Sequence, residues 1–248
     1  MNKLLSIKRV FILALKGCFL LPLVAFAQQD ERYECLIEPA VELALSSSVA
    51  GVIKSIKVDR GDVVKKGQVL VRLEATAELA TIELAKAKLE FGQRKVERTE
   101  ELFREKFTSE YSVDEAVTES RLAEVELAQA KALLSLKTLR SPINGIVVER
   151  LAQVGEFVSD DEILKLAQLD PLYVEVILPL EQLNSIKKEM EATVFPGPPI
   201  EGEYKATVVT VDRVLDAASG TFGVRLALPN PGTLLPAGLR CMVEFPRP

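Results

Sequence analysis

The stretch Gly61–Leu70, GDVVKKGQVL, returns in altered form at Gly155–Leu164, GEFVSDDEIL. Both run glycine, acid, apolar residue, valine, two polar residues, a turn residue, a polar residue, an apolar residue and leucine. The same offset of 94 residues extends the match upstream, pairing Ser47 with Ser141, Val49 with Ile143, Gly51 with Gly145, Val52 with Ile146 and Ile53 with Val147. Glycines fall on glycines and apolar residues on apolar residues, so the chain contains an internal repeat.

Each copy of the repeat predicts short strands broken by glycine turns, as in VAGVIKSIKV followed by VVKKGQVLVRL. One copy is too short to bury a core of its own, so two copies that face each other should share one. We therefore expect a single small β-sandwich, with structural turn glycines at Gly51, Gly61, Gly145 and Gly155.

The segment between the two copies, residues 74–139, has a different composition. It is rich in Ala, Leu, Glu, Lys and Arg, and apolar residues recur at helical spacing on both sides of the break FTSEYS. Ser112 with Glu115 forms a capping box that predicts the start of the second helix. We expect an antiparallel coiled-coil hairpin inserted in the sandwich, with the apolar stripe Leu79, Ile82, Leu89, Val96 and Phe103 in one arm and Val113, Ala116, Val117, Ala123, Leu127, Ala130 and Leu134 in the other.

The stripe is interrupted by polar residues. Lys86, Gln93, Glu100, Glu124 and Lys131 fall where a coiled-coil seam would be apolar. Either the helices also contact neighbours outside the chain, or the hairpin is exposed and marginally stable.

The remainder of the chain, residues 170–248, predicts an all-β domain, either a sandwich or a small barrel. Alternating segments such as DPLYVEVILP and GTFGVRLALPNP are separated by Gly, Pro, Asn and Asp turns, and LEQLNSIKKEM predicts a short helix. Residues 28–44 precede the first copy of the repeat and could add a strand to this domain. That strand would bring Cys35 near Cys241.

Residues 1–27 have the layout of a cleaved secretory signal peptide: a basic start, an apolar run and Ala25-Phe26-Ala27 before a polar segment. They hold four of the 31 basic residues and none of the 36 acidic ones, so the rest of the chain carries 27 against 36, a formal charge of −9. Such an acidic chain lacks the electrostatic footprint of a nucleic-acid-binding protein.

Export makes a disulfide possible, and two cysteines follow the signal segment, Cys35 and Cys241. They could form a bridge between the two ends of the chain, or they could be two small buried side chains that never meet. The sequence does not choose between these alternatives, since the separation of the two Cα atoms decides.

Residue types that carry chemistry are scarce. The chain has no histidine, and it shows no cluster with metal-ligand spacing and no phosphate-binding glycine-rich loop. We therefore expect no catalytic residue, no metal and no cofactor.

Three segments in this order resemble the periplasmic adaptors, also called membrane fusion proteins or the HlyD-like family. Residues 46–75 resemble the first half of their lipoyl-like domain, residues 139–179 the second half running into the barrel, and residues 211–244 the barrel end in the branch serving resistance–nodulation–division pumps. The resemblance implies a mainly β fold with an α-helical hairpin, divided as signal peptide 1–27, N-terminal segment 28–44, lipoyl-like halves 45–73 and 140–169, hairpin 74–139 and β-barrel 170–248.

The resemblance also implies a function. Family members link an inner-membrane transporter to an outer-membrane TolC-type channel as a homo-oligomeric ring in the periplasm. In the channel-binding branch the hairpin tip carries Arg, three residues, Leu, six residues, Ser, which Arg98, Leu102 and Ser109 match here. By resemblance these three contact the channel. Taken alone they would be a solvated charge, a seam residue and a helix cap.

Two other interpretations and one departure from the family accompany this prediction. A lipoyl or biotin carrier needs a modified lysine in the turn between the halves, where this chain places RLEATAEL. A structural coiled-coil protein of the envelope would explain the hairpin but not the tip spacing. Many adaptors continue past the barrel into a membrane-proximal domain, which we expect to be missing here, so the transporter class stays open between proton-driven and ATP-driven.

Overall fold

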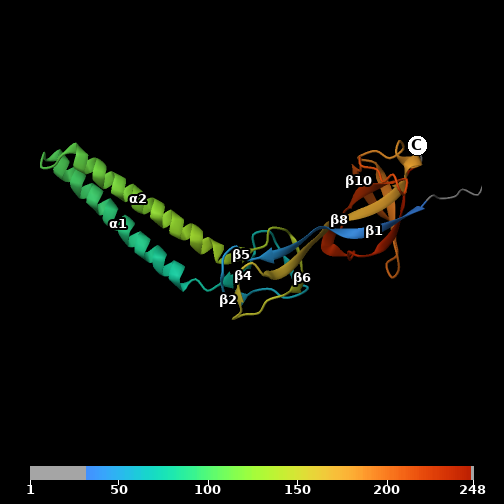
Figure 1. Ribbon diagram of the computed structural model, residues 1–248, viewed down its shortest axis with the longest axis horizontal. Helices are drawn as coiled ribbons and strands as arrows, with labels where there is room; N and C mark the ends of the chain where they lie inside the picture. The colour runs from blue at the N-terminus through green and yellow to red at the C-terminus, as the bar shows by residue number, and fades with distance from the viewer. Residues whose placement is uncertain (1–31, 247–248) are drawn as a thin grey trace, which may run out of the picture. The chain divides into compact units, whose positions relative to one another are not determined.

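The computed structural model describes residues 32–246, so the predicted signal peptide lies outside the described residues. The described chain forms a helical hairpin, a two-layered β-sandwich and a β-barrel (Figure 1). The fold class is confirmed as mainly β with an inserted α-hairpin. Within residues 32–246, no helix is both long and apolar enough to span a membrane.

The sandwich is built from the two copies of the repeat. The first copy supplies β2 (Gly51–Ile56), β3 (Val63–Val64) and β4 (Val69–Leu73). The second supplies β5 (Thr138–Arg140), β6 (Gly145–Arg150), β7 (Phe157–Val158) and the start of β8 (Glu162–Pro179). One layer has the strand order β5-β4-β2-β7, and β6 and β3 form the end of the other sheet.

The strand pairs of the sandwich are related by the same 94-residue offset that relates the two copies of the repeat. β2 pairs with β7 through Val52 opposite Phe157, and β3 pairs with β6 through Val63 opposite Ile146. Each pair becomes the other when the two copies are exchanged. The same exchange relates the hydrogen bond from Gly61 N–H to the Val147 carbonyl and the one from Gly155 N–H to the Ile53 carbonyl, each 2.8 Å long. The sandwich is therefore pseudo-two-fold symmetric.

The shared core follows the same symmetry. Four aligned pairs are buried together, namely Ile53 with Val147, Val58 with Ala152, Val64 with Val158 and Leu70 with Leu164. Neither copy could cover these side chains alone, which explains why the chain carries the motif twice.

The four glycines play two different roles. Gly61 and Gly155 both have a φ of 90° and serve as the turn residues predicted. Gly51 and Gly145, however, are not turn residues, because each begins a strand. A Cβ atom on Gly145 would lie 2.1 Å from the Ala167 carbonyl oxygen, so close backbone approach selects glycine there.

The barrel closes from six antiparallel strands. Its order is β1-β12-β9-β10-β11-β8, and β8 pairs back with β1. The bounds are β1 Arg32–Ser46, β9 Glu191–Pro196, β10 Tyr204–Val211, β11 Thr221–Leu228 and β12 Arg240–Glu244. The N-terminal segment thus supplies a barrel strand, and closure leaves the barrel without unpaired strand edges.

The structure differs from the expectations for this region in three respects. The expected helix over LEQLNSIKKEM is only a 3-10 turn, Leu180–Gln182, followed by irregular chain. The strand β9 was not predicted. In addition, the predicted boundary between residues 169 and 170 falls inside β8, which pairs with β6 in its first half and with β11 in its second.

Cys35 and Cys241 face each other across β1 and β12 and are joined by a disulfide, with Cα atoms 4.8 Å apart. Both belong to the buried core of the barrel. The bridge therefore joins strands from the two ends of the described chain within the barrel.

The hairpin consists of α1 (Thr76–Arg104) and α2 (Glu110–Leu136), which pack side by side (Figure 1). Their seam follows a heptad spacing, with one run through Ile82, Ala85, Leu89, Gly92, Val96, Thr99 and Phe103 and the other through Val113, Ala116, Ser120, Ala123, Leu127, Ala130 and Leu134.

This seam corrects the predicted one. Leu79 is 52 % exposed, and the polar residues placed in the seam, Lys86, Gln93, Glu100, Glu124 and Lys131, all lie outside it. Ala85, Gly92 and Thr99 take the positions assigned to Lys86, Gln93 and Glu100. The prediction followed large apolar residues, whereas this seam depends on small ones, which let the helix axes approach.

The base of the hairpin is fixed to the sandwich by Lys137. Its ammonium group lies 3.1 Å from the Glu78 carboxylate in the first turn of α1 and donates to the Ala50 carbonyl at 3.0 Å. The backbone N–H of Glu78 and the Lys137 ammonium group hold the pKa of the Glu78 carboxyl below its usual value. The neighbouring backbone is paired as well, with Leu73 N–H donating to the Lys137 carbonyl at 2.9 Å.

Candidate functional site

The predicted contact residues lie at the end of the hairpin away from its base, where α1 turns into α2. α1 ends in a Schellman motif: Lys106 N–H donates to the Phe103 carbonyl at 2.9 Å, and Phe107 N–H donates to the Leu102 carbonyl at 2.8 Å. Lys106 occupies the left-handed position of this motif with a φ of 65°. We call residues 98–112 the tip.

Ser109 is the residue that starts α2. Its hydroxyl oxygen accepts a hydrogen bond from Ser112 N–H at 3.3 Å and lies 3.1 Å from the Ser112 hydroxyl. The predicted capping box on Ser112 and Glu115 was therefore wrong by one turn. The helix begins at Glu110, so the cap is Ser109, the residue just before the helix, rather than Ser112 inside it.

Arg98 and Leu102 share one face of α1, one helical turn apart. Arg98 is exposed, and within residues 32–246 its guanidinium group makes no hydrogen bond or ion pair. Leu102 is 41 % exposed and lies outside the heptad run of the seam. The structure thus brings Arg98, Leu102 and Ser109 onto one end of the hairpin, with Ser109 engaged in capping.

Two aromatic residues at the tip were not identified from the sequence. Phe107 is 77 % exposed and Tyr111 is 76 % exposed. The sequence does carry a signal for them, because the break FTSEYS contains both Phe107 and Tyr111 in a segment where a turn is normally polar. Together with Leu102 they give the tip an apolar surface that nothing in the described chain covers.

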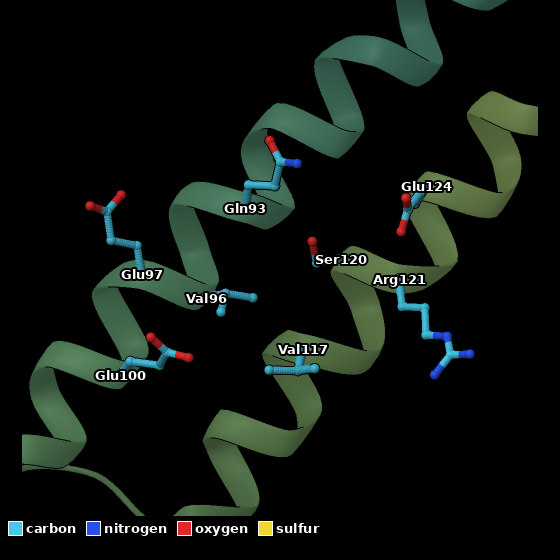
Figure 2. Close-up of a pocket in the computed structure, with 8 residues that line it drawn as sticks. All are labelled: Gln93, Val96, Glu97, Glu100, Val117, Ser120, Arg121 and Glu124. Carbon is cyan, nitrogen blue, oxygen red and sulfur yellow. The ribbon is translucent and has the colours of Figure 1, made fainter.

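A groove lies along the hairpin just behind the tip (Figure 2). It has a volume of about 570 Å³. Val96 extends from α1 toward α2 at its floor, and three carboxylates, Glu97, Glu100 and Glu124, line its sides with Arg121. It is an open trough between two helices and not an enclosed ligand pocket.

In the part of the chain that the structure describes, no group of three or more His, Cys, Asp or Glu side chains is placed to hold a metal ion. The prominent features of residues 32–246 are instead exposed surfaces on helices and strands. The arrangement is suited to protein contacts.

The combination of a repeated sandwich, an inserted hairpin and a six-stranded barrel defines the architecture of a periplasmic membrane fusion protein. The family model for the CzcB-like barrel-sandwich hybrid domain matches residues 42–168. This chain belongs to that family.

Curated relatives agree with this assignment. The chain is 26 % identical over 211 residues to the solvent efflux pump periplasmic linker SrpA of Pseudomonas putida, covering 77 % of this chain and 54 % of that protein. It is 28 % identical over 222 residues to the nodulation protein NolF of Rhizobium meliloti, covering 82 % and 59 %. The chain thus spans little more than half the length of these relatives.

Solved structures show the same fold. A MacA–MexA chimera that contains the Pseudomonas aeruginosa MexA α-hairpin domain superposes with a TM-score of 0.75 at 20 % identity, covering 87 % of this chain and 78 % of that one. The membrane fusion protein Spr0693 of Streptococcus pneumoniae R6 superposes with a TM-score of 0.72 at 15 % identity, covering 88 % and 99 %.

Proposed function

We propose that this chain is the periplasmic adaptor of an efflux system, joining an inner-membrane transporter to an outer-membrane channel without catalysing a reaction. The observation that carries the proposal is the exposed pair Arg98 and Leu102 at the end of a hairpin in a chain of this family. The relatives named as efflux pump periplasmic linkers support the same role.

The tip has the composition expected of a protein contact. Phe107, Tyr111 and Leu102 present apolar surface, and Arg98 offers an unpaired guanidinium group that can hydrogen-bond to carbonyl or carboxylate oxygens of a partner. Aromatic residues and arginine are the side chains that most often dominate binding energy at interfaces. Ser109 caps the start of α2, and its hydroxyl lies 3.1 Å from the Ser112 hydroxyl, with either oxygen able to donate.

The proposal extends to location and partners. The signal-like segment 1–27 would export the chain to the periplasm, where the hairpin tip meets a TolC-type channel and the barrel meets a transporter, with the resistance–nodulation–division type favoured. Several copies would surround the export path as a ring.

The test is a photo-crosslinking amino acid placed at Phe107 in cells, with captured proteins identified by mass spectrometry. Phe107 is preferable to Ser109 because it is 77 % exposed and, unlike Ser109, caps no helix. Capture of an outer-membrane channel is the expected result. A matched probe at Leu84, which is 61 % exposed on α1 but close to the base, should not capture the channel. Equal capture at both positions, or capture of no channel at Phe107, would contradict the tip assignment.

A further inference from the structure

The internal repeat gives the sandwich two equivalent edge surfaces. β3 is the end strand of one sheet, and β7 is the end strand of the other. Val63 on β3 is 68 % exposed, and its counterpart Phe157 on β7 is 65 % exposed. Both strands are only two residues long, and each presents a large apolar side chain to solvent at a position where its neighbour is buried.

The residues that follow these two side chains carry opposite charges. Val63 is followed by Lys65 and Lys66, whereas Phe157 is followed by Asp160 and Asp161. All four side chains are exposed, and among residues 32–246 none of them forms an ion pair. We call Val63, Lys65 and Lys66 the basic patch, and Phe157, Asp160 and Asp161 the acidic patch.

We propose that the basic patch of one copy of this chain docks on the acidic patch of the next copy. Apolar contact between Val63 and Phe157 would be flanked by lysines facing aspartates. This inference rests on the proposed adaptor function and identifies the surfaces through which its ring would assemble.

Charge selects this arrangement over its alternatives. If two copies met through the same patch, the lysines of one copy would face the lysines of the other, or the aspartates of one would face the aspartates of the other. Both contacts are repulsive. Contact between unlike patches is heterologous, so each copy keeps one patch free for a further neighbour. Heterologous contacts produce a closed ring or an open filament rather than a dimer.

The internal symmetry explains how such a contact could arise. The apolar centres of the two patches, Val63 and Phe157, are exchanged by the pseudo-two-fold axis, and so are Lys66 and Asp160. The turns that follow differ in sequence and in conformation: Lys65 corresponds to Ser159, and Gly67, which has a φ of 84°, corresponds to Asp161, which does not adopt this conformation. The two corresponding edges therefore carry charges of opposite sign.

The experiment uses charge reversal in the full chain. The variant Lys65→Glu, Lys66→Glu carries two acidic patches, and the variant Asp160→Lys, Asp161→Lys carries two basic ones. Each alone should associate with itself at least about tenfold more weakly than the unaltered chain in sedimentation velocity at low salt. An equimolar mixture should recover assembly, because every contact in it can pair unlike patches. Recovery also shows that both variants are folded.

Covalent trapping covers assembly that is too transient to sediment. Val63→Cys and Phe157→Cys chains, prepared separately and mixed, should form the mixed disulfide in preference to either like pair. Unchanged association of the reversed variants, failure of the mixture to assemble, or equal yields of like and unlike disulfides would overturn the patch assignment. If channel capture at Phe107 persists in that case, the adaptor function stands and only this inference falls.

Discussion

A Cβ atom placed on Gly92 of α1 would lie 3.0 Å from the Cα atom of Ser120 on α2. A contact this short would require the neighbouring helix to shift, and it occurs beside the groove behind the tip. The position of the tip therefore depends on a glycine in the middle of a long helix, where glycine would otherwise be unfavourable.

Substitution of Gly92 by leucine should lower the free energy of unfolding of the hairpin by about 1–3 kcal/mol, because the added side chain meets the backbone of α2 at Ser120 and forces the helices apart. Thermal unfolding followed by circular dichroism measures the loss. Gln93→Leu adds the same side chain one position along, on the exposed side, and should be tolerated. Equal stability of the two variants would show that the close approach is not required.

The charge reversal Arg98→Asp should abolish capture of the outer-membrane channel while the unfolding temperature stays close to that of the unaltered chain. An exposed helical side chain without partners changes stability by less than about 0.5 kcal/mol. The readout is channel capture from a crosslinker at Phe107. Arg94→Asp, one turn farther from the tip on the same face, is the control and should retain capture. Normal capture by the Arg98 variant would remove this residue from the contact.

Lys106→Gly should stabilise the hairpin by about 1 kcal/mol, because lysine is held in a left-handed conformation that glycine adopts without strain. Chemical denaturation gives the value. Glu105→Gly is a sharp comparison, since Glu105 has a φ of −82° and gains nothing from glycine. Destabilisation by both changes would mean that the Lys106 side chain itself contributes to the turn.

The Glu78 carboxylate should contribute stability that depends on pH. Its pKa is lowered in the folded chain by its own backbone N–H and by Lys137, so the contribution is complete at neutral pH, above the unfolded pKa. It disappears as the pH falls from the ordinary carboxyl range through the lower folded pKa. Glu78→Gln should cost on the order of 1 kcal/mol near pH 7 and nothing in strong acid.

The control for this pH dependence is Glu83→Gln, which removes an exposed carboxylate paired with Lys86 on the same helix. A surface pair of this kind contributes little. Acid unfolding curves of the two variants, compared with the unaltered chain, separate the effects. A Glu78→Gln penalty that is the same at pH 3 and pH 7 would assign the loss to packing instead of charge.

Much of this fold could be predicted because the repeat consists of turn glycines and buried apolar residues, which are compatible with few other local structures. Gly61 and Gly155 occupy identical left-handed turns, and Val64 and Val158 are buried together, so an alignment of the chain with itself already contained the sandwich. The hairpin followed from composition and from one break.

The parts that were not predicted depend on small residues and on distant partners. The seam is built on Ala85, Gly92 and Ser120, whose side chains give hydrophobic pattern analysis little to detect. The strand β9 is defined by its pairing with β10 and β12, which lie elsewhere in the sequence. At the tip, the spacing of Arg98, Leu102 and Ser109 was visible, but the exposure of Phe107 and Tyr111 required the turn geometry.

The inserted hairpin also bears on how the sandwich can form. Leu73 and Lys137 are joined by a backbone hydrogen bond at its base, and all the chain between them lies in the hairpin. Helices that meet across a short turn form quickly because their contacts are local, whereas joining two distant strands costs loop-closure entropy. A weakened hairpin, as in Gly92→Leu, should therefore slow refolding of the sandwich in stopped-flow measurements. The hairpin, whose tip is proposed to meet a partner, thus also brings the two halves of the sandwich together at its base during folding.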